Sequence, residues 1–167
     1  MGVALTACGP VGFTTEIKGQ GTVAGGTGLG GVLTMFPQLS TLTNIDFDQS
    51  QDFKNNNTSR DHVTSVLLKS MTLKISSPND QDFSFLDTIQ FVAKTGENEA
   101  VFAQKSNISK LGLKAPNPVL TLDSTNVDLA PFVRASTMSI VMRGTGRQPP
   151  QDTRVEVITV FNVFVKL

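Results

Sequence analysis

Tryptophan and tyrosine are absent from this chain, which has only one His and one Cys. A zinc site built from His and Cys needs three or four such ligands, and a Ser–His–Asp or Cys–His site would have to use His62. No apolar run approaches the ~20 residues that cross a bilayer as a helix. Basic and acidic residues balance at 14 each, which gives no reason to expect a nucleic-acid partner. We therefore predict a non-enzymatic protein with no catalytic residues and no cofactor.

The charged pairs that invite a chemical interpretation all lie in segments typical of turns. They are Asp61 with His62, Asp80 with Asp82, and Arg143 with Arg147 in "RGTGR". A general base, a hydrolytic carboxylate pair and an anion site are the respective functional alternatives. Solvated charges are the norm in turns, so we interpret all three pairs as surface residues.

A glycine-rich stretch, "GQGTVAGGTGLGGVLTMFPQLS", occupies residues 19–40. A phosphate-binding loop would end in Gly-Lys-Ser or Gly-Lys-Thr and open a helix, and this stretch does neither. We therefore predict no nucleotide site here. Gly28, Gly30 and Gly31 are interpreted as a long flexible connection. Apolar residues hold it against the body of the protein, namely Leu29, Val32, Leu33, Met35 and Phe36.

The remainder of the chain alternates between short apolar-patterned runs and turn signals. Runs at 13–18, 63–75, 83–94, 99–104 and 154–167, with "VLTL", "VDL" and "STMSIVMRG" between them, indicate about eight to ten strands. Leu67 and Leu68 fall on opposite faces of the second run, which indicates a bulge or a buried crossing there. The fold class predicted is all-β, an antiparallel β-sandwich of immunoglobulin-like or jelly-roll-like type, with one or two short helical turns.

The acidic stretch "DFDQSQD" resembles part of a calcium loop. Asp46, Asp48 and Asp52 have the spacing of ligands, but the sixth place holds Gln51 rather than Gly and the twelfth holds Asn57 rather than Glu. These three residues are therefore weak metal candidates. A solvated acidic face running into a short helical turn is the preferred interpretation, and we predict no metal.

The last predicted strand is apolar on both faces. One face is formed by alternate residues, namely Val155, Val157, Thr159, Phe161, Val163 and Val165. Ile158, Val160 and Phe164 lie on the other face, where an antiparallel sandwich strand is ordinarily polar. We expect this face to be covered, either by residues 29–36 with Leu29, Leu33 and Phe36 as anchors, or by a partner protein or the membrane.

The single cysteine, Cys8, ends the sequence "LTAC". These residues resemble the bacterial lipobox, an aliphatic residue and two small ones before a Cys that receives a diacylglycerol. The alternative is a partly buried thiol near the terminus. We expect residues 1–10 to be a truncated signal-peptide remnant with lipobox and tether, and residues 11–167 to form a single sandwich domain. Gly9, rather than Asp, after the Cys resembles the pattern of lipoproteins exported to the outer membrane.

A longer block, "NNNTSRDHVTSVLLKSMTLKISSPNDQDFSFLDTIQF" at 55–91, resembles a group of uncharacterised lipoproteins from Bacteroidetes and other Gram-negative envelopes. "VDLAPFV" at 127–133 and "PPQDTRVEV" at 149–157 are similar to the closing half of the same group. The resemblance implies a lipobox and an immunoglobulin-like sandwich. It implies no activity and no catalytic residues.

Two functional hypotheses follow from these patterns. The first is a non-enzymatic lipoprotein of the bacterial cell envelope, anchored in the outer membrane through Cys8, that binds or scaffolds another envelope component. The alternative is a carbohydrate- or calcium-dependent ligand-binding module. Sandwiches often stack sugars on Trp or Tyr, and this chain has neither.

Overall fold

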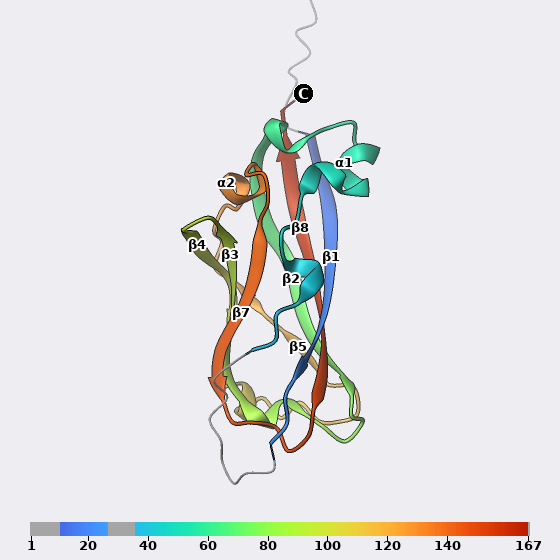
Figure 1. The fold of residues 1–167 in the computed structure, drawn as a ribbon, viewed down its shortest axis with the longest axis vertical. Helices are drawn as coiled ribbons and strands as arrows, with labels where there is room; N and C mark the ends of the chain where they lie inside the picture. Colours follow the sequence, from blue (N-terminus) through green and yellow to red (C-terminus); the bar gives the residue numbers. More distant parts are fainter. Residues whose placement is uncertain (1–10, 27–35, 167) are drawn as a thin grey trace, which may run out of the picture.

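The computed structural model describes residues 11–26 and 36–166, which form two four-stranded antiparallel sheets (Figure 1). The first sheet has the order β1 (Val11–Val23), β8 (Thr153–Val165), β2 (Val63–Ser77) and β5 (Val119–Thr121). The second sheet has the order β6 (Asp123–Ser124), β4 (Asn98–Lys105), β3 (Leu86–Thr95) and β7 (Ser139–Gly146). The prediction of an all-β sandwich is confirmed. The last strand lies between the first two, whereas the constant-type immunoglobulin order puts the first two strands side by side.

The core lies between the two sheets and is built by period-two alternation. On β8 the predicted inward face is buried, namely Val155, Val157, Thr159, Phe161, Val163 and Val165, and Thr153 at the start of the strand is buried with it. The rings of Phe161 from the first sheet and Phe102 from the second lie 5.8 Å apart between centroids. Because an extended strand turns successive side chains to opposite faces, one register fixes which residues of β8 are buried and which face outward.

One open edge of the sandwich, between β1 and β7, is closed by residues 36–45. Leu39 and Leu42 of this segment are buried against β1. A Cβ at Gly19 would lie 2.8 Å from Leu42 Cγ, and a Cβ at Gly21 would lie 2.6 Å from Leu39 Cδ2. These glycines therefore belong to a strand that leaves room for two leucines. The strand predicted at 13–18 is longer than expected, because β1 continues to Val23. Gly28, Gly30 and Gly31, interpreted as a flexible connection, lie outside the described residues.

The opposite edge is closed by the chain crossing from β5 to β6. Leu122, between these strands, is buried and donates its backbone N–H to Met71 O at 3.0 Å. Residues before it pair with β2 in the first sheet, and residues after it pair with β4 in the second. A single short extended segment therefore joins both sheets along this edge.

Helical structure in the described residues is confined to short turns. The α-helices are α1 (Gln51–Asn55) and α2 (Ala130–Val133). The 3-10 turns are η1 (Ser40–Leu42), η2 (Phe47–Gln49), η3 (Arg60–His62), η4 (Phe83–Phe85) and η5 (Ile108–Lys110). The predicted strand "VDL" at 127–129 was wrong: Asp128 instead accepts the N–H groups of Val66 and Ala130, both at 2.9 Å, and so fixes the start of α2 on β2.

The strand β8 fixes the geometry of the first sheet because it pairs with β1 on one side and β2 on the other. Val11, the first residue of β1, lies opposite Val165, the last residue of β8. The start of β1 and the end of β8 therefore meet at one end of the molecule, where the C-terminus is marked in Figure 1. We call this the Val11 end.

Candidate functional site

The outward face of the first sheet carries the apolar residues that the sequence analysis singled out. Ile158, Val160 and Phe164 alternate with the buried residues of β8 and are half-buried, neither exposed nor enclosed. Lys18 and Thr72 flank Ile158, while Glu16 and Ser70 flank Val160. Part of the expected cover is thus provided by neighbours within the sheet.

The ring of Phe164 lies over a glycine of the neighbouring strand. Gly12 pairs with Phe164, and a Cβ at Gly12 would lie 3.1 Å from the ring atom Cε1. On the other side Phe164 is flanked by Ser65 of β2. The ring therefore rests on backbone and small side chains, with its outer surface open.

Leu67 extends this face onto β2. It lies opposite Asn162 of β8, and its side chain is 36% exposed. A bulge between Leu68 and Ser70 follows it, as the placement of Leu67 and Leu68 on opposite faces predicted. We call Leu67, Ile158, Val160 and Phe164 together the apolar stripe. The sequence analysis had not assigned Leu67 to this face, although its parity relative to the buried Val66 carries that information.

The stripe is more apolar toward the Val11 end than toward the opposite end. Near Val11, Phe164 is flanked by Gly12 and Ser65, and Leu67 lies opposite Asn162. Farther along, Glu156 is flanked by Lys74 and Gln20, and Arg154 follows. Polarity on this single face therefore changes along the length of β8.

The prediction that residues 29–36 cover the stripe can be checked only at Phe36, and there the structure does not support it. Leu29 and Leu33 lie outside the described residues. Phe36 lies against β7 of the other sheet: a Cβ at Gly144 would be 3.1 Å from Phe36 Cζ, and Phe36 lines a small hollow with Ile140 and Met142. Phe36 as an anchor for the stripe was therefore wrong, because its segment closes the β1–β7 edge instead.

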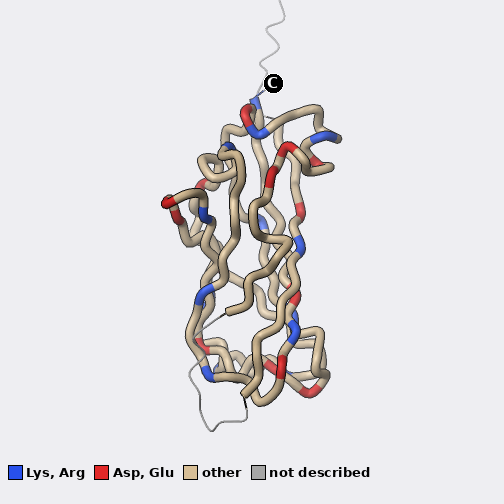
Figure 2. Tube along the Cα trace, viewed as in Figure 1, with Lys and Arg blue, Asp and Glu red and all other residues tan. Residues whose placement is uncertain are grey.

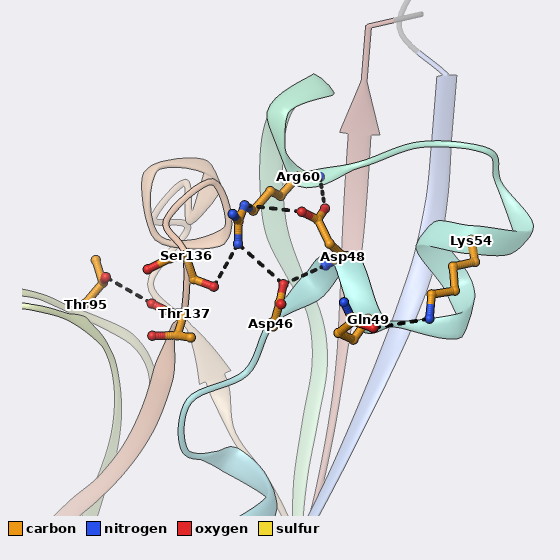
Figure 3. Close-up of polar contacts among 8 residues, drawn as sticks. All are labelled: Asp46, Asp48, Gln49, Lys54, Arg60, Thr95, Ser136 and Thr137. Carbon is orange, nitrogen blue, oxygen red and sulfur yellow. Dashed lines mark hydrogen bonds and ion pairs between the residues drawn. The ribbon is translucent and has the colours of Figure 1, made fainter.

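The acidic stretch forms an ion-paired cluster around Arg60 (Figure 3). Arg60 Nη1 lies 3.4 Å from Asp46 Oδ1, and Arg60 Nε lies 3.4 Å from Asp48 Oδ2. The guanidinium also donates to Ser136 O at 2.8 Å, and the backbone N–H of Arg60 donates to Asp48 Oδ1 at 2.8 Å. Asp46 accepts the N–H of Asp48 at 3.1 Å, which caps η2. The two carboxylates thus tie residues 46–60 to the loop before β7.

Asp52, the third weak metal candidate, is engaged elsewhere. Its Oδ2 accepts the hydroxyl of Thr15 on β1 at 2.8 Å. The contacts of Asp46 and Asp48 run to Arg60, so the structure divides the three carboxylates between two structural roles. In residues 11–26 and 36–166, no three His, Cys, Asp or Glu side chains gather as metal ligands do.

On the outer face of the second sheet an ion-pair network spans the central strand. Arg143 of β7 donates to Glu99 of β4 at 2.9 Å, and Lys94 of β3 lies 3.3 Å from the same carboxylate. Val92 of β3, flanked by Val101 and Val141, is 1% exposed and lies outside the core cluster. The hydrogen bond from Arg143, with that from Lys94, holds the pKa of Glu99 below its usual value of 4.5.

A polar hollow lies farther along the same sheet. Its lining includes Gln90, Gln104 and Lys105, with Asp123 at its rim. Lys105 Nζ donates to both carboxylate oxygens of Asp123, at 3.1 and 3.0 Å. The hollow therefore presents amide groups beside a closed ion pair.

Three of the remaining charged candidates, His62, Asp80 and Asp82, have structural partners. His62 Nδ1 lies 3.2 Å from Ser59 Oγ within the η3 turn, and Asp80 accepts from Gln151 at 3.2 Å. Asp82 caps η4 by accepting the N–H of Ser84 at 2.9 Å, and its hydrogen bonds from Ser84 lower the pKa of Asp82. Burial acts to raise the pKa of Asp128, but the N–H groups of Val66 and Ala130 outweigh it and leave that pKa lowered.

Cys8 lies outside the described residues. No protein-family model and no curated protein matches this chain. None of the helices in the described ranges is long and apolar enough to cross a membrane. Two features of the molecule therefore bear on its function: the lipobox-like sequence that ends at Cys8, and the apolar stripe on the first sheet.

Proposed function

We propose that this protein is a non-enzymatic lipoprotein of the bacterial cell envelope, anchored in the outer membrane through Cys8. Its sandwich would bind or scaffold another envelope component. The observation that carries the proposal is the position of Cys8, which closes the lipobox-like "LTAC" three residues before Val11, where β1 begins. A lipid on Cys8 would thus attach almost directly to a strand of the folded domain.

The sandwich supports the proposal by its construction. Structural partners engage most of the charged candidates, namely Asp46, Asp48, Asp52, His62, Asp80, Asp82 and Arg143, while the apolar stripe remains half-covered. Exposed apolar residues that share one face are typical of surfaces that meet a partner or a membrane. The geometry therefore favours a binding surface over a reaction centre.

The test is mass spectrometry of the protein isolated from the membranes of its native bacterium. We expect an N-terminal peptide that begins at Cys8 and carries the mass of a diacylglycerol. A Cys8→Ser variant should move from the membrane fraction to the soluble fraction. Recovery of an unmodified peptide running from Met1 to Lys18 would contradict the proposal.

A second candidate is a carbohydrate-binding module, favoured by the polar hollow that Gln90 and Gln104 line. Side-chain amides can both donate to and accept from sugar hydroxyl groups. Calorimetric titration with envelope glycans tests this candidate, with Gln90→Ala and Gln104→Ala as the variants that should abolish binding. A ligand that binds these variants unchanged would exclude the hollow as the site.

A further inference from the structure

We propose that part of the apolar stripe rests on the lipid surface to which Cys8 is anchored. The residues concerned are Leu67, Val160 and Phe164, with Gly12 beneath the Phe164 ring; we call them the tether-proximal patch. This inference rests on the proposed function and adds to it the orientation of the domain and the surface that touches lipid.

The reach of the tether is the first argument. Cys8 and Val11 are separated by three Cα–Cα steps of about 3.8 Å, so the chain between them spans at most about 11 Å. Strand β1 has 13 residues and, at about 3.3 Å per residue, is roughly 43 Å long. A domain held this closely by one end of β1 can bring the Val11 end against the membrane, whereas the opposite end stays distant unless the domain lies flat.

The location of the patch is the second argument. Gly12 is the second residue of β1, and Phe164 pairs with it. Leu67 lies opposite Asn162, two residues before Phe164 on β8. On β8 and β2 the apolar outward residues are therefore concentrated toward the end that the tether holds near lipid, while Glu156, Lys74 and Arg154 occupy the far part of these two strands.

The chemistry of the patch is the third argument, and it favours the neutral, apolar part of the lipid surface. Glu16 and Lys18, the nearest charges on β1, pair with one another at 3.0 Å. Lys and Arg residues are interspersed with Asp and Glu residues along the molecule instead of gathering at the Val11 end (Figure 2). Contact with lipid should therefore depend on apolar burial, as interfacial anchoring does, and should be insensitive to salt.

The chain offers a direct test because it has one Cys and no Trp or Tyr. The purified chain is coupled through the thiol of Cys8 to phosphatidylcholine vesicles that carry a maleimide lipid. Leu67→Trp places the only indole on the patch, at a position that is 36% exposed and so tolerant of a larger side chain. Val119→Trp is the matched control, since Val119 is 46% exposed and lies on the same outward face, opposite Lys74 at the far end.

On coupling, we expect the emission of Leu67→Trp to shift to shorter wavelength and to be quenched by brominated lipids, at low and high salt alike. The emission of Val119→Trp should stay unchanged. Asn162→Trp, beside Leu67, serves as a second reporter if Leu67→Trp melts differently from the parent.

Three results would overturn the inference. Absence of quenching at both Leu67 and Asn162 would show that the patch does not touch lipid. Equal quenching at Val119 would show that the domain lies flat. An emission shift that depends on protein concentration without vesicles would assign the patch to a second copy of the chain. Because the coupling is chemical, none of these results depends on native lipidation, which the Met1–Lys18 peptide tests separately.

Discussion

Val92 and Leu67 both occupy outward positions on central strands of their sheets, yet Val92 is 1% exposed and Leu67 is 36% exposed. Above Val92, Arg143 reaches from β7 to Glu99 on β4 and so spans the strand between them. On the first sheet the nearest ion pair, Glu16 with Lys18, joins two residues of one strand. An ion pair between strands can therefore cover apolar surface, because long charged side chains place their methylene groups over it. An ion pair along one strand leaves the neighbouring surface open.

An outward apolar residue on a sandwich strand therefore indicates an interaction surface only where no side chains from neighbouring strands cover it. The second sheet has enclosed Val92 on its outward face, and the first has left its stripe accessible at the Val11 end. We therefore assign the interaction surface to the first sheet. Four predictions separate the inner face, the covered outer face and the open outer face.

The largest effect is expected on the inner face of β8. Phe161 is 0% exposed and contacts Phe102 of the other sheet, so Phe161→Ala removes a ring from the core and leaves a cavity. We expect a loss of about 3–5 kcal/mol in the free energy of unfolding, measured by urea denaturation. A loss no larger than that of a half-buried residue would mean that the two sheets are not closely packed at this point.

The second prediction compares two outward valines. Val92→Ala deletes two methyl groups from an enclosed position and should cost about 1.5 kcal/mol, at roughly 0.8 kcal/mol for each buried group. Val160→Ala deletes the same groups from the open stripe, where part of the side-chain surface remains in water, and should cost less. Urea denaturation of the two variants measures the difference. Equal losses would show that the ion pair does not enclose Val92.

The third prediction concerns the open stripe itself. Phe164 is half-buried, so Phe164→Ser should lower the free energy of unfolding by about 1 kcal/mol, less than the roughly 1.5–3 kcal/mol of a fully enclosed side chain. Limited proteolysis should cut within residues 19–40 at the same rate as in the parent, because Phe36 lies against β7 rather than on the stripe. Faster cutting in that segment would restore the expectation that it covers Phe164.

Local patterns in the sequence predicted much of this arrangement. The alternation along β8 identified both of its faces, and the parity of Leu67 and Leu68 indicated the bulge that follows. These features were accessible because strand periodicity and bulges are properties of a few consecutive residues.

Features that depend on distant pairs were not predicted. The hydrogen bond between Arg143 and Glu99 joins residues 44 positions apart, and Arg60 reaches Asp46 and Asp48 across 14 and 12 positions. The role of Gly19 and Gly21 was not predicted, because the leucines that fill the space beside them come later in the chain. Sequence reasoning thus found the apolar residues of the candidate face, but could not tell which outward face would be covered.

The smallest effect is expected from Glu99→Gln, which weakens the cover over Val92. The pKa of Glu99 in the folded protein lies below its usual value of 4.5, chiefly because Arg143 donates to the carboxylate. A lowered folded-state pKa means that the ionised group stabilises the fold above 4.5, and that this contribution is lost as pH falls through the folded-state pKa. The melting temperature of the parent should therefore fall on acidification, and Glu99→Gln should remove part of that fall while melting at a slightly lower temperature at neutral pH.

Glu97→Gln is the matched control in the same hairpin, because Glu97 has no ion pair within residues 11–26 and 36–166. Since the pair is solvent-accessible, added salt should reduce the difference between parent and Glu99→Gln. Identical acid profiles for parent and Glu99→Gln would show that Val92 is enclosed by its valine neighbours alone, and that the ionic cover contributes nothing to the difference between the two faces.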